Sequence, residues 1–300
     1  MRSAASFLDL SRSGSLGELH DQLLRAAVET DEPPQPLLSQ VSAELRDVDD
    51  AELPPRPLVA LRLIAARAYD AAWLVLKDNA QGVVTESFGQ NTLSGELPSS
   101  SRLPLTTKVE PPLVYAWLPG FRDPRHGAPD AAYDVTHLAT PRVHLEEMWW
   151  DGPALVLAGT AWLRHLSTSQ DDRIWLVCTQ TDGRSHVLDG RRLRRADHVR
   201  GTGGELTRLA WSGWQARLAR RDLPAPGNWR LALRLDHQQL VHERPLGPSC
   251  GPAVPGLAPG PGGAVARRDG RRLTVMLKAP AAVRAARRVL HPIARSARQR

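Results

Sequence analysis

The spacing of hydrophobic residues divides the chain into parts with different periods. Before residue 80 the apolar residues recur every three or four positions, as on one face of a helix, and groups of prolines interrupt them. This pattern predicts a first helix that begins at Leu16, a second over Leu37–Val48 and a third from Leu58 to about Lys77. We therefore expect a helical region over residues 1–80.

The next part of the chain has no clear period. Gly, Ser and Pro are frequent between residues 80 and 105, and one strand-like run, Leu113–Leu118, follows two prolines. Another loop rich in Pro, Gly and Asp comes after that run. We expect residues 81–141 to form a linker with one or two strands.

From residue 142 the period changes to two, which is typical of strands with one buried and one wet face. In the clearest run, Trp229–Asp236, Trp and Leu residues alternate with polar residues or Ala. The dipeptides Asp182-Gly183 and Asp269-Gly270 are expected to form hairpin turns. Eight or so short strands predict an immunoglobulin-like antiparallel β-sandwich over residues 142–279. The predicted fold class is therefore α+β.

Three tryptophans lie close together in residues 142–166, where two apolar runs flank a Trp-Asp-Gly turn. Trp162 is expected to fill the core of the sandwich, together with Trp214 and Trp229 from later strands. Trp149 and Trp150 are adjacent, so only one of them can point inward on a regular strand. The outward one is a candidate for an aromatic interface or for stacking on a sugar.

The positive charge of the chain is concentrated at its C-terminal end. Eleven basic residues and one acidic residue lie between positions 262 and 300, so this end carries +10 and the preceding chain −3 of the net charge of +7. An apolar stripe accompanies the charges, which predicts a basic amphipathic helix over residues 280–300. Such a helix suits an anionic membrane surface, and docking on the chain's own sandwich is the alternative. The candidate membrane-surface residues are Arg284, Arg287, Arg288, Arg295 and Arg298.

A second basic cluster follows the Asp182-Gly183 turn. Guanidinium groups can hold an anionic polymer through paired hydrogen bonds to phosphate or carboxylate oxygens. A solvated strand face is the alternative interpretation of the same pattern. The candidate polymer-binding residues are Arg184, Arg191, Arg192, Arg194 and Arg195.

The sequence predicts no catalytic residue, no metal site and no cofactor. Histidines and carboxylates are dense between His126 and His144, but their spacing matches no known ligand pattern. Glu146 and Glu147 are expected to point to opposite faces of a strand, which excludes a catalytic pair. Cys178 is expected to be an inert core thiol, whereas its pairing with Cys250 is left open.

No signal peptide and no apolar run of about 20 residues is evident in the sequence, which favours a cytoplasmic protein, peripheral at the inner membrane face. Two cysteines in 300 residues are consistent with a reducing compartment. Nucleic acid is disfavoured as a partner because basic and aromatic residues do not alternate and no nucleic-acid-binding module is evident.

Four runs in the β-region carry a family resemblance: WWDGPALVLAGTAWLRHL, DDRIWLVCTQTDGRSHVLDGRRLRRAD, WSGWQARLARRDLPAPGNWRLALRL and GRRLTVMLK. They resemble the C-terminal immunoglobulin-like β-domain of actinobacterial family 2 glycosyltransferases of the wall-teichoic-acid type. The resemblance covers residues 142–300. The catalytic domain of that family, with its Asp-x-Asp motif, has no counterpart here, so no catalytic residue is carried over.

The resemblance implies a non-catalytic accessory module of the cell envelope, positioned or oligomerised at the membrane surface. Its implied partners are an anionic membrane surface or an anionic cell-wall polymer, a glycosyltransferase, or further copies of the chain. A glycan-binding or polyphosphate-binding β-domain is the second hypothesis. The third hypothesis is an enzyme with an unrecognised site in the loops at residues 120–145.

Overall fold

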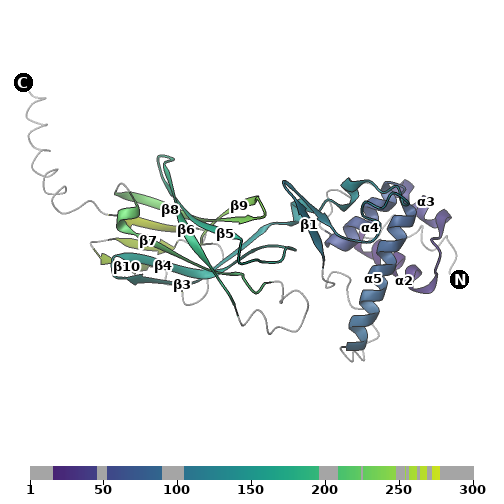
Figure 1. The fold of residues 1–300 in the computed structure, drawn as a ribbon, viewed down its shortest axis with the longest axis horizontal. Coiled ribbons are helices and arrows are strands. Elements are labelled where there is room, and N and C mark those ends of the chain that lie inside the picture. The colour runs from purple at the N-terminus through teal and green to yellow at the C-terminus, as the bar shows by residue number, and fades with distance from the viewer. Residues whose placement is uncertain are drawn as a thin grey trace, which may run out of the picture. The chain divides into compact units, whose positions relative to one another are not determined.

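The computed structural model describes residues 16–45, 53–89, 105–195, 209–223, 226–247, 254, 257–261, 264–268 and 272–277. The chain divides into two compact units, Met1–Ala139 and Thr140–Arg300 (Figure 1). The first unit contains the helices and the second contains the larger sheet. The chain is therefore α+β, as predicted. The predicted helix over residues 280–300 lies outside the described residues.

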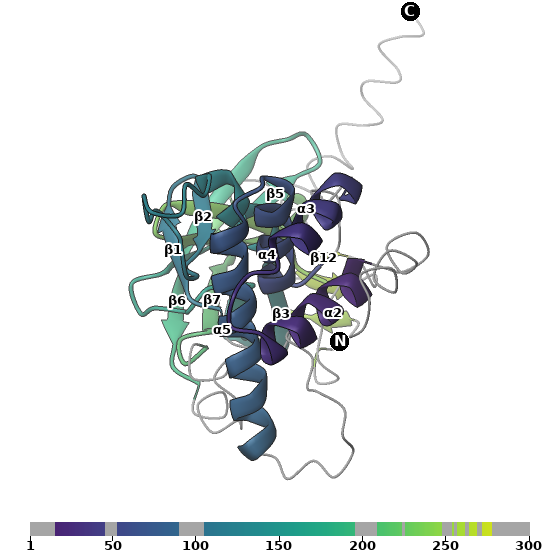
Figure 2. The same ribbon diagram turned by 90° about the vertical axis from the view of Figure 1, so that its right-hand side faces the viewer.

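The described part of the first unit includes four α-helices, which lie together in Figure 2: α2 (Leu16–Glu29), α3 (Gln35–Glu44), α4 (Pro55–Ala65) and α5 (Tyr69–Gly89). The apolar residues of α4 are buried on nearly all its sides, which is typical of a helix at the centre of a core. Both α2 and α5 pack against α4 and against each other. The helical unit is thus built around α4.

The helix predicted from Leu58 to Lys77 is in fact two helices. Arg67 between them has a left-handed backbone with a φ of 60°. The backbone amide of Ala68 donates to Leu63 O at 2.9 Å and that of Arg67 to Ile64 O at 2.9 Å, which is the bonding pattern of a Schellman C-cap. Glycine usually occupies this cap position. Because arginine occupies the position instead, the break between the two helices could not be recognised from the residue pattern.

The predicted linker contains two strands, as expected, and in addition helical elements that the sequence pattern did not indicate. Helix α5 continues to Gly89, and a hairpin of β1 (Thr107–Glu110) and β2 (Leu113–Ala116) follows. Two short 3-10 helices come next, η3 (Asp130–Tyr133) and η4 (Thr136–Leu138). The guanidinium of Arg62 on α4 donates to Asp134 O at 2.5 Å. Tyr133 and Val135 are buried, so this part of the chain contributes to the core of the first unit.

Antiparallel strands make up the second unit. They are β3 (Pro141–Asp151), β4 (Ala154–Leu163), β5 (Arg173–Gln180), β6 (Ser185–Leu193), β7 (Gly213–Ala219), β8 (Gly227–His237), β9 (Leu240–Pro245), β10 (Leu257–Pro259), β11 (Val265–Arg268) and β12 (Leu273–Leu277). The predicted pairing of β5 with β6 and of β11 with β12 is confirmed. The predicted alternation of β8 is also confirmed, because Trp229, Leu231, Leu233 and Leu235 are buried.

In the part of the chain that the structure describes, these strands form one hydrogen-bonded sheet. Its order is β10-β11-β12-β8-β5-β6-β7-β4-β3, and β9 also pairs with β8. Strand β6 pairs with β5 up to Asp189 and with β7 from Gly190 onward, so it joins the two halves of the sheet. An immunoglobulin-like sandwich would have two separate sheets. The pairing instead produces a continuous, nearly closed, barrel-like sheet.

Side chains connect β3, at one end of this strand order, to β10 at the other end and to β9. The indole Nε1 of Trp150 on β3 donates to Ala258 O on β10, and the guanidinium of Arg244 on β9 donates to Pro141 O at the start of β3. Trp214 and Trp229 are fully buried, as predicted for core residues. Trp162 is only half-buried and does not belong to this core, which corrects the prediction.

Candidate functional site

The five arginines predicted to bind a polymer do not form one site. Arg184 lies at the β5–β6 turn and bonds to Asp182, while Arg191 and Arg194 are exposed. Arg195 forms an ion pair of 2.5 Å with Glu146. Consecutive residues on β6 point to opposite faces, which separates their side chains. The cluster in the sequence is therefore not a cluster in space.

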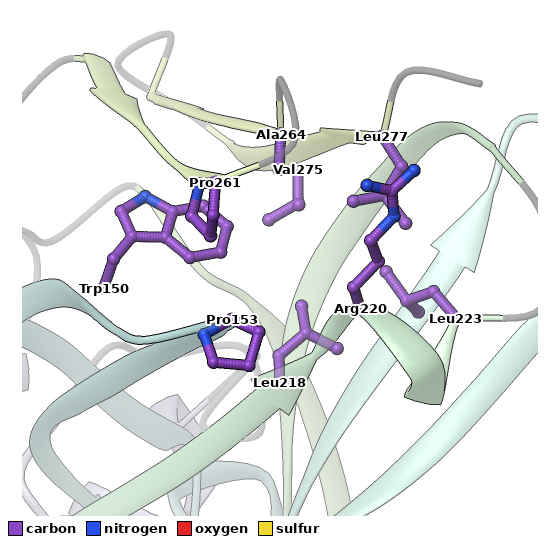
Figure 3. Close-up of a pocket in the computed structure, with 9 residues that line it drawn as sticks. All are labelled: Trp150, Pro153, Leu218, Arg220, Leu223, Pro261, Ala264, Val275 and Leu277. Atoms are coloured by element: carbon purple, nitrogen blue, oxygen red, sulfur yellow. The ribbon is translucent and has the colours of Figure 1, made fainter. Parts of the chain in front are cut away.

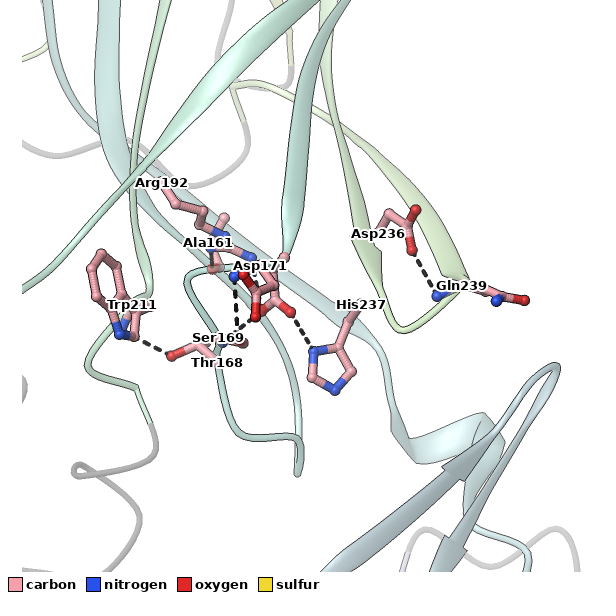
Figure 4. A network of polar contacts seen from close by, with 10 residues as sticks. Ala161, Thr168, Ser169, Asp171, Arg192, Trp211, Asp236, His237 and Gln239 are labelled. Carbon is pink, nitrogen blue, oxygen red and sulfur yellow. Dashed lines mark hydrogen bonds and ion pairs between the residues drawn. The ribbon is translucent and has the colours of Figure 1, made fainter.

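Arg192 is buried, with 6% of its side chain exposed, and takes part in an internal polar network (Figure 4). Its Nη1 donates to Ala161 O at 2.6 Å, and its Nη2 lies 3.5 Å from Asp172 Oδ2. Asp172 Oδ1 lies 2.7 Å from Nδ1 of His237. Burial lowers the pKa of Arg192 to about 10. Because its hydrogen bonds are directed inward, Arg192 is a structural residue.

A polar hollow of about 350 Å³ lies on the outer face of β3 and β4, and we call it the basic groove. Arg142 faces Trp162 across the two strands, and His144 faces Thr160. The alternate residues Val143 and Leu145 are buried on the core side. The residues that line the basic groove are Arg142, Val143, His144, Glu146, Thr160, Trp162 and Arg244.

A β-bulge at Glu146 shapes one end of the basic groove. Leu145 pairs with Gly159 and Glu147 pairs with Ala158, so Glu146 is the extra residue. A Cβ on Gly159 would collide with the carbonyl oxygen of His144, so only glycine fits opposite the bulge. The burial pattern shifts there, and neither Glu146 nor Glu147 is buried. The prediction that these two carboxylates point to opposite faces is therefore wrong, because the strand is not regular at this point.

The basic groove carries a net positive charge from Arg142 and Arg244. Glu146 is the one acid among its seven lining residues, and it is neutralised by Arg195 and accepts a hydrogen bond of 3.2 Å from Thr160 Oγ1. Within the described part of the chain, no carboxylate forms an ion pair with Arg142 or Arg244. Burial, together with the charges of Arg164 and Arg142, lowers the pKa of nearby His165 to about 4. The groove is therefore suited to an anionic group.

Trp149 and Trp150 have different surroundings. Trp149 is 38% exposed, whereas Trp150 packs over Gly260 and forms the hydrogen bond to Ala258. A second hollow of about 120 Å³ lies beside Trp150 (Figure 3). Its lining is mostly apolar and includes Pro153, Leu218, Leu223, Ala264, Val275 and Leu277. Trp149 is therefore the outward tryptophan. Trp150 is a structural residue that connects β3 to β10.

Other candidate chemistry has structural explanations. Among the described residues, no group of three or more His, Cys, Asp or Glu side chains is placed to hold a metal ion. Asp130 bonds to Arg122, and Asp134 bonds to Thr136. Cys178 is a buried free thiol, and burial raises its pKa to about 12, so the prediction of an inert core thiol is confirmed. The described helices include none with the length and apolar character of a membrane span.

Sequence reasoning did not single out the residues of the basic groove as a site. The alternation of Arg142, His144 and Glu146 with Val143 and Leu145 was a usable signal, because it places three polar side chains on one face. Arg244 gave no such signal, since its approach to β3 depends on the closure of the sheet. Of the predicted arginines, Arg195 alone contacts a groove residue by a described ion pair.

The fold and the groove define an α+β protein whose β-unit carries a positively charged surface groove. No protein-family model matches the sequence, and no curated protein matches it. Among solved structures, the chain is similar to the crystal structure of S. aureus TarS 217–571, with a TM-score of 0.44 and 13% sequence identity. The alignment covers 92% of this chain and 74% of that one. A likeness at this level carries no argument about function.

Proposed function

We propose that the chain is a non-catalytic accessory module that binds an anionic glycan polymer of the cell envelope through the basic groove. The observation that carries the proposal is that Arg142 and Arg244 line one groove together with the half-buried indole of Trp162. Guanidinium groups bind phosphate or carboxylate oxygens in paired geometry. An indole offers an apolar face to the sugar or polyol between two anionic groups.

The family resemblance of residues 142–300 is consistent with this ligand class, because glycosyltransferases of the wall-teichoic-acid type act on an anionic polymer. Binding rather than catalysis is favoured by the state of the carboxylates near the groove. Glu146 is paired with Arg195, and Asp172 is buried between Arg192 and His237. Neither is free to act as a general acid or base.

Calorimetric titration with poly(glycerol phosphate) tests the proposal. The double variant R142A/R244A is expected to bind at least about tenfold more weakly, because each guanidinium supplies charge-assisted hydrogen bonds. Binding should also weaken as salt is added. The matched control R184A/R191A removes the same charge from the arginines first predicted to bind polymer. Equal weakening by the two double variants would contradict a site in the groove.

The basic C-terminal residues 262–300 support a second candidate role, which is binding to an anionic membrane surface. The observation that supports this role is the charge of +10 over residues 262–300, together with an apolar stripe in the sequence. Co-sedimentation with vesicles that contain phosphatidylglycerol tests this role, with the full chain compared to a chain that lacks residues 280–300. Equal binding by the two chains would exclude the tail as the membrane contact.

A further inference from the structure

An exposed tryptophan on the first unit lies on a stack of aromatic rings. Trp117 follows β2 and is 52% exposed. Its ring meets Phe121 edge-on at 5.4 Å between centroids, and Phe121 contacts Tyr115 at 5.3 Å and Tyr133 at 5.2 Å. We call these four residues the aromatic platform. Tyr115 and Tyr133 are buried, so the platform offers one exposed ring, Trp117, backed by a packed aromatic cluster.

The loop that carries the platform is held firmly in place. The amide of Trp117 donates to Thr106 O at 2.8 Å, and the hydroxyl of Tyr133 donates to Pro119 O at 3.1 Å. Gly120 has a φ of +82°, and a Cβ there would crowd the Tyr133 hydroxyl and the Cβ of Ala71 on α5. A ligand on this platform would therefore meet a site that is already ordered, which reduces the entropy lost on binding.

Charged side chains surround the rings in a fixed network. The Arg122 guanidinium lies over Phe121 at 4.9 Å and over Tyr115 at 5.2 Å, with bonds to Glu110 at 2.6 and 2.8 Å and to Asp130 at 2.8 Å. Lys108 bonds to Glu110 at 2.7 Å and lies 5.4 Å from the centre of the Trp117 ring. The network holds hydrogen-bonding groups at the rim of the platform.

The backbone of Arg122 is strained, which is uncommon for an arginine at the surface. Its φ is 55°, in the left-handed region that non-glycine residues rarely adopt. Such strain persists where the surroundings over-determine a conformation, and it gathers at binding sites. The strained conformation keeps the guanidinium over the rings, so it supports a role for this arrangement beyond folding.

The charge and the exposed area of the aromatic platform limit the class of ligand that it could bind. Arg122 and Lys108 are balanced by Glu110 and Asp130, so the rim has no net charge to attract a polyanion or an acidic membrane. A stable protein interface buries about 800 Å² on each partner. One exposed indole within a charged rim is far smaller than that apolar area. Its face is instead comparable in size to a single sugar ring.

We propose that the aromatic platform is a second carbohydrate site, which stacks the pyranose ring of an uncharged sugar on Trp117. The apolar C–H face of the sugar would lie on the indole, and its hydroxyls would bond to Glu110, Arg122 and Asp130. Arg122 and Lys108 hold the pKa of Glu110 at about 2, so this carboxylate accepts hydrogen bonds throughout the neutral range. The site is separate from the basic groove in both residues and ligand class.

Titration of the full chain with maltotetraose and with chitotetraose, two neutral oligosaccharides, tests this proposal. We expect saturable binding of at least one of them, and W117A should weaken it about tenfold, as the loss of a stacking ring does. W117F should retain part of the affinity. V241A is the control, since it removes an exposed apolar side chain of the other unit, and it should bind as the parent chain does.

The proposal is overturned if neither oligosaccharide binds, or if W117A binds as tightly as the parent chain. It is also overturned if W117A alters self-association in sedimentation while sugar binding is unchanged, because the platform would then be a protein contact. The variant R142A/R244A should leave the neutral sugar bound. Loss of poly(glycerol phosphate) binding and loss of neutral-sugar binding are therefore separate results.

Discussion

The indole Nε1 of Trp150 donates a hydrogen bond of 3.2 Å to the carbonyl oxygen of Ala258, and the two residues lie on β3 and β10, at opposite ends of the strand order. The ring also packs over Gly260 and lines the hollow beside Leu218 and Val275. A single side chain thus joins two strands that share no backbone pairing in the described sheet. The contribution of this contact between β3 and β10 to stability can be tested by substitution.

Removal of the Trp150 ring should destabilise the second unit. W150A is expected to lower the free energy of unfolding by about 2–3 kcal/mol, through the cavity it leaves and the lost hydrogen bond. Its neighbour Trp149 is exposed, so W149A should cost less than about 1 kcal/mol. Urea unfolding followed by circular dichroism gives both values. Equal effects of W150A and W149A would show that the contact between β3 and β10 adds nothing to stability.

Arg192 should be far more important for stability than its neighbour Arg191. R192A leaves the buried carboxylate of Asp172 without its cation, which is expected to cost about 3–5 kcal/mol. Arg191 is exposed on the same strand, and R191A should change stability by about 0.5 kcal/mol or less. Chemical denaturation of the two variants tests the contrast. A small effect of R192A would mean that solvent reaches Asp172.

The stability of the second unit should fall in mild acid because of His165. Its folded pKa is about 4, below the ordinary value of 6.5, so the unfolded chain binds the proton more readily. The stabilising effect of neutral His165 is therefore fully present above about pH 6.5 and is lost as the pH falls toward about 4.

His165→Asn is a suitable variant for this test. Asparagine tolerates the left-handed backbone that His165 adopts, with a φ of 65°. Unfolding free energies measured between neutral pH and mild acid should decline less in H165N than in the parent chain. A parallel decline would assign the acid sensitivity to other groups. An NMR titration of R142A should also show the His165 pKa rising, since one of the two repelling charges is removed.

The thiol of Cys178 should be unreactive in the folded protein. Its side chain is buried and its pKa is raised to about 12, so almost no thiolate is present at neutral pH. In a C250S variant, which leaves Cys178 as the remaining thiol of the sequence, a disulfide reagent should react in denaturant but not in buffer. Rapid labelling of the native variant would contradict the buried position.

Alternating side chains made much of the sheet predictable. The apolar faces of β7 and β8 are buried as expected, because each strand has one buried and one wet face. The turn at Gly183, with a φ of 90°, followed from the Asp-Gly dipeptide. These features depend on residues a few positions apart, which a single sequence displays directly.

Features that depend on distant contacts could not be predicted in this way. Arg67 ends a helix in a conformation that usually requires glycine, and it does so within the packed first unit. The bulge at Glu146 reverses which face is buried, so the strand pattern beyond it is misread. The groove itself needs Arg244 to reach β3 across the closed sheet. The helix break at Arg67 and the approach of Arg244 leave no local signal, whereas the bulge leaves one in Gly159, a glycine within a strand.

Strand β6 has a consequence for how the second unit forms. Its first half needs β5, which is itself held by β8, while its second half needs β7. Strand β8 pairs in turn with β12, near the end of the chain. During synthesis, the half of the sheet that contains β8 cannot be completed until residues beyond 270 have emerged. The second unit should therefore fold late and in one cooperative step, at the pace set by its long-range strand pairs.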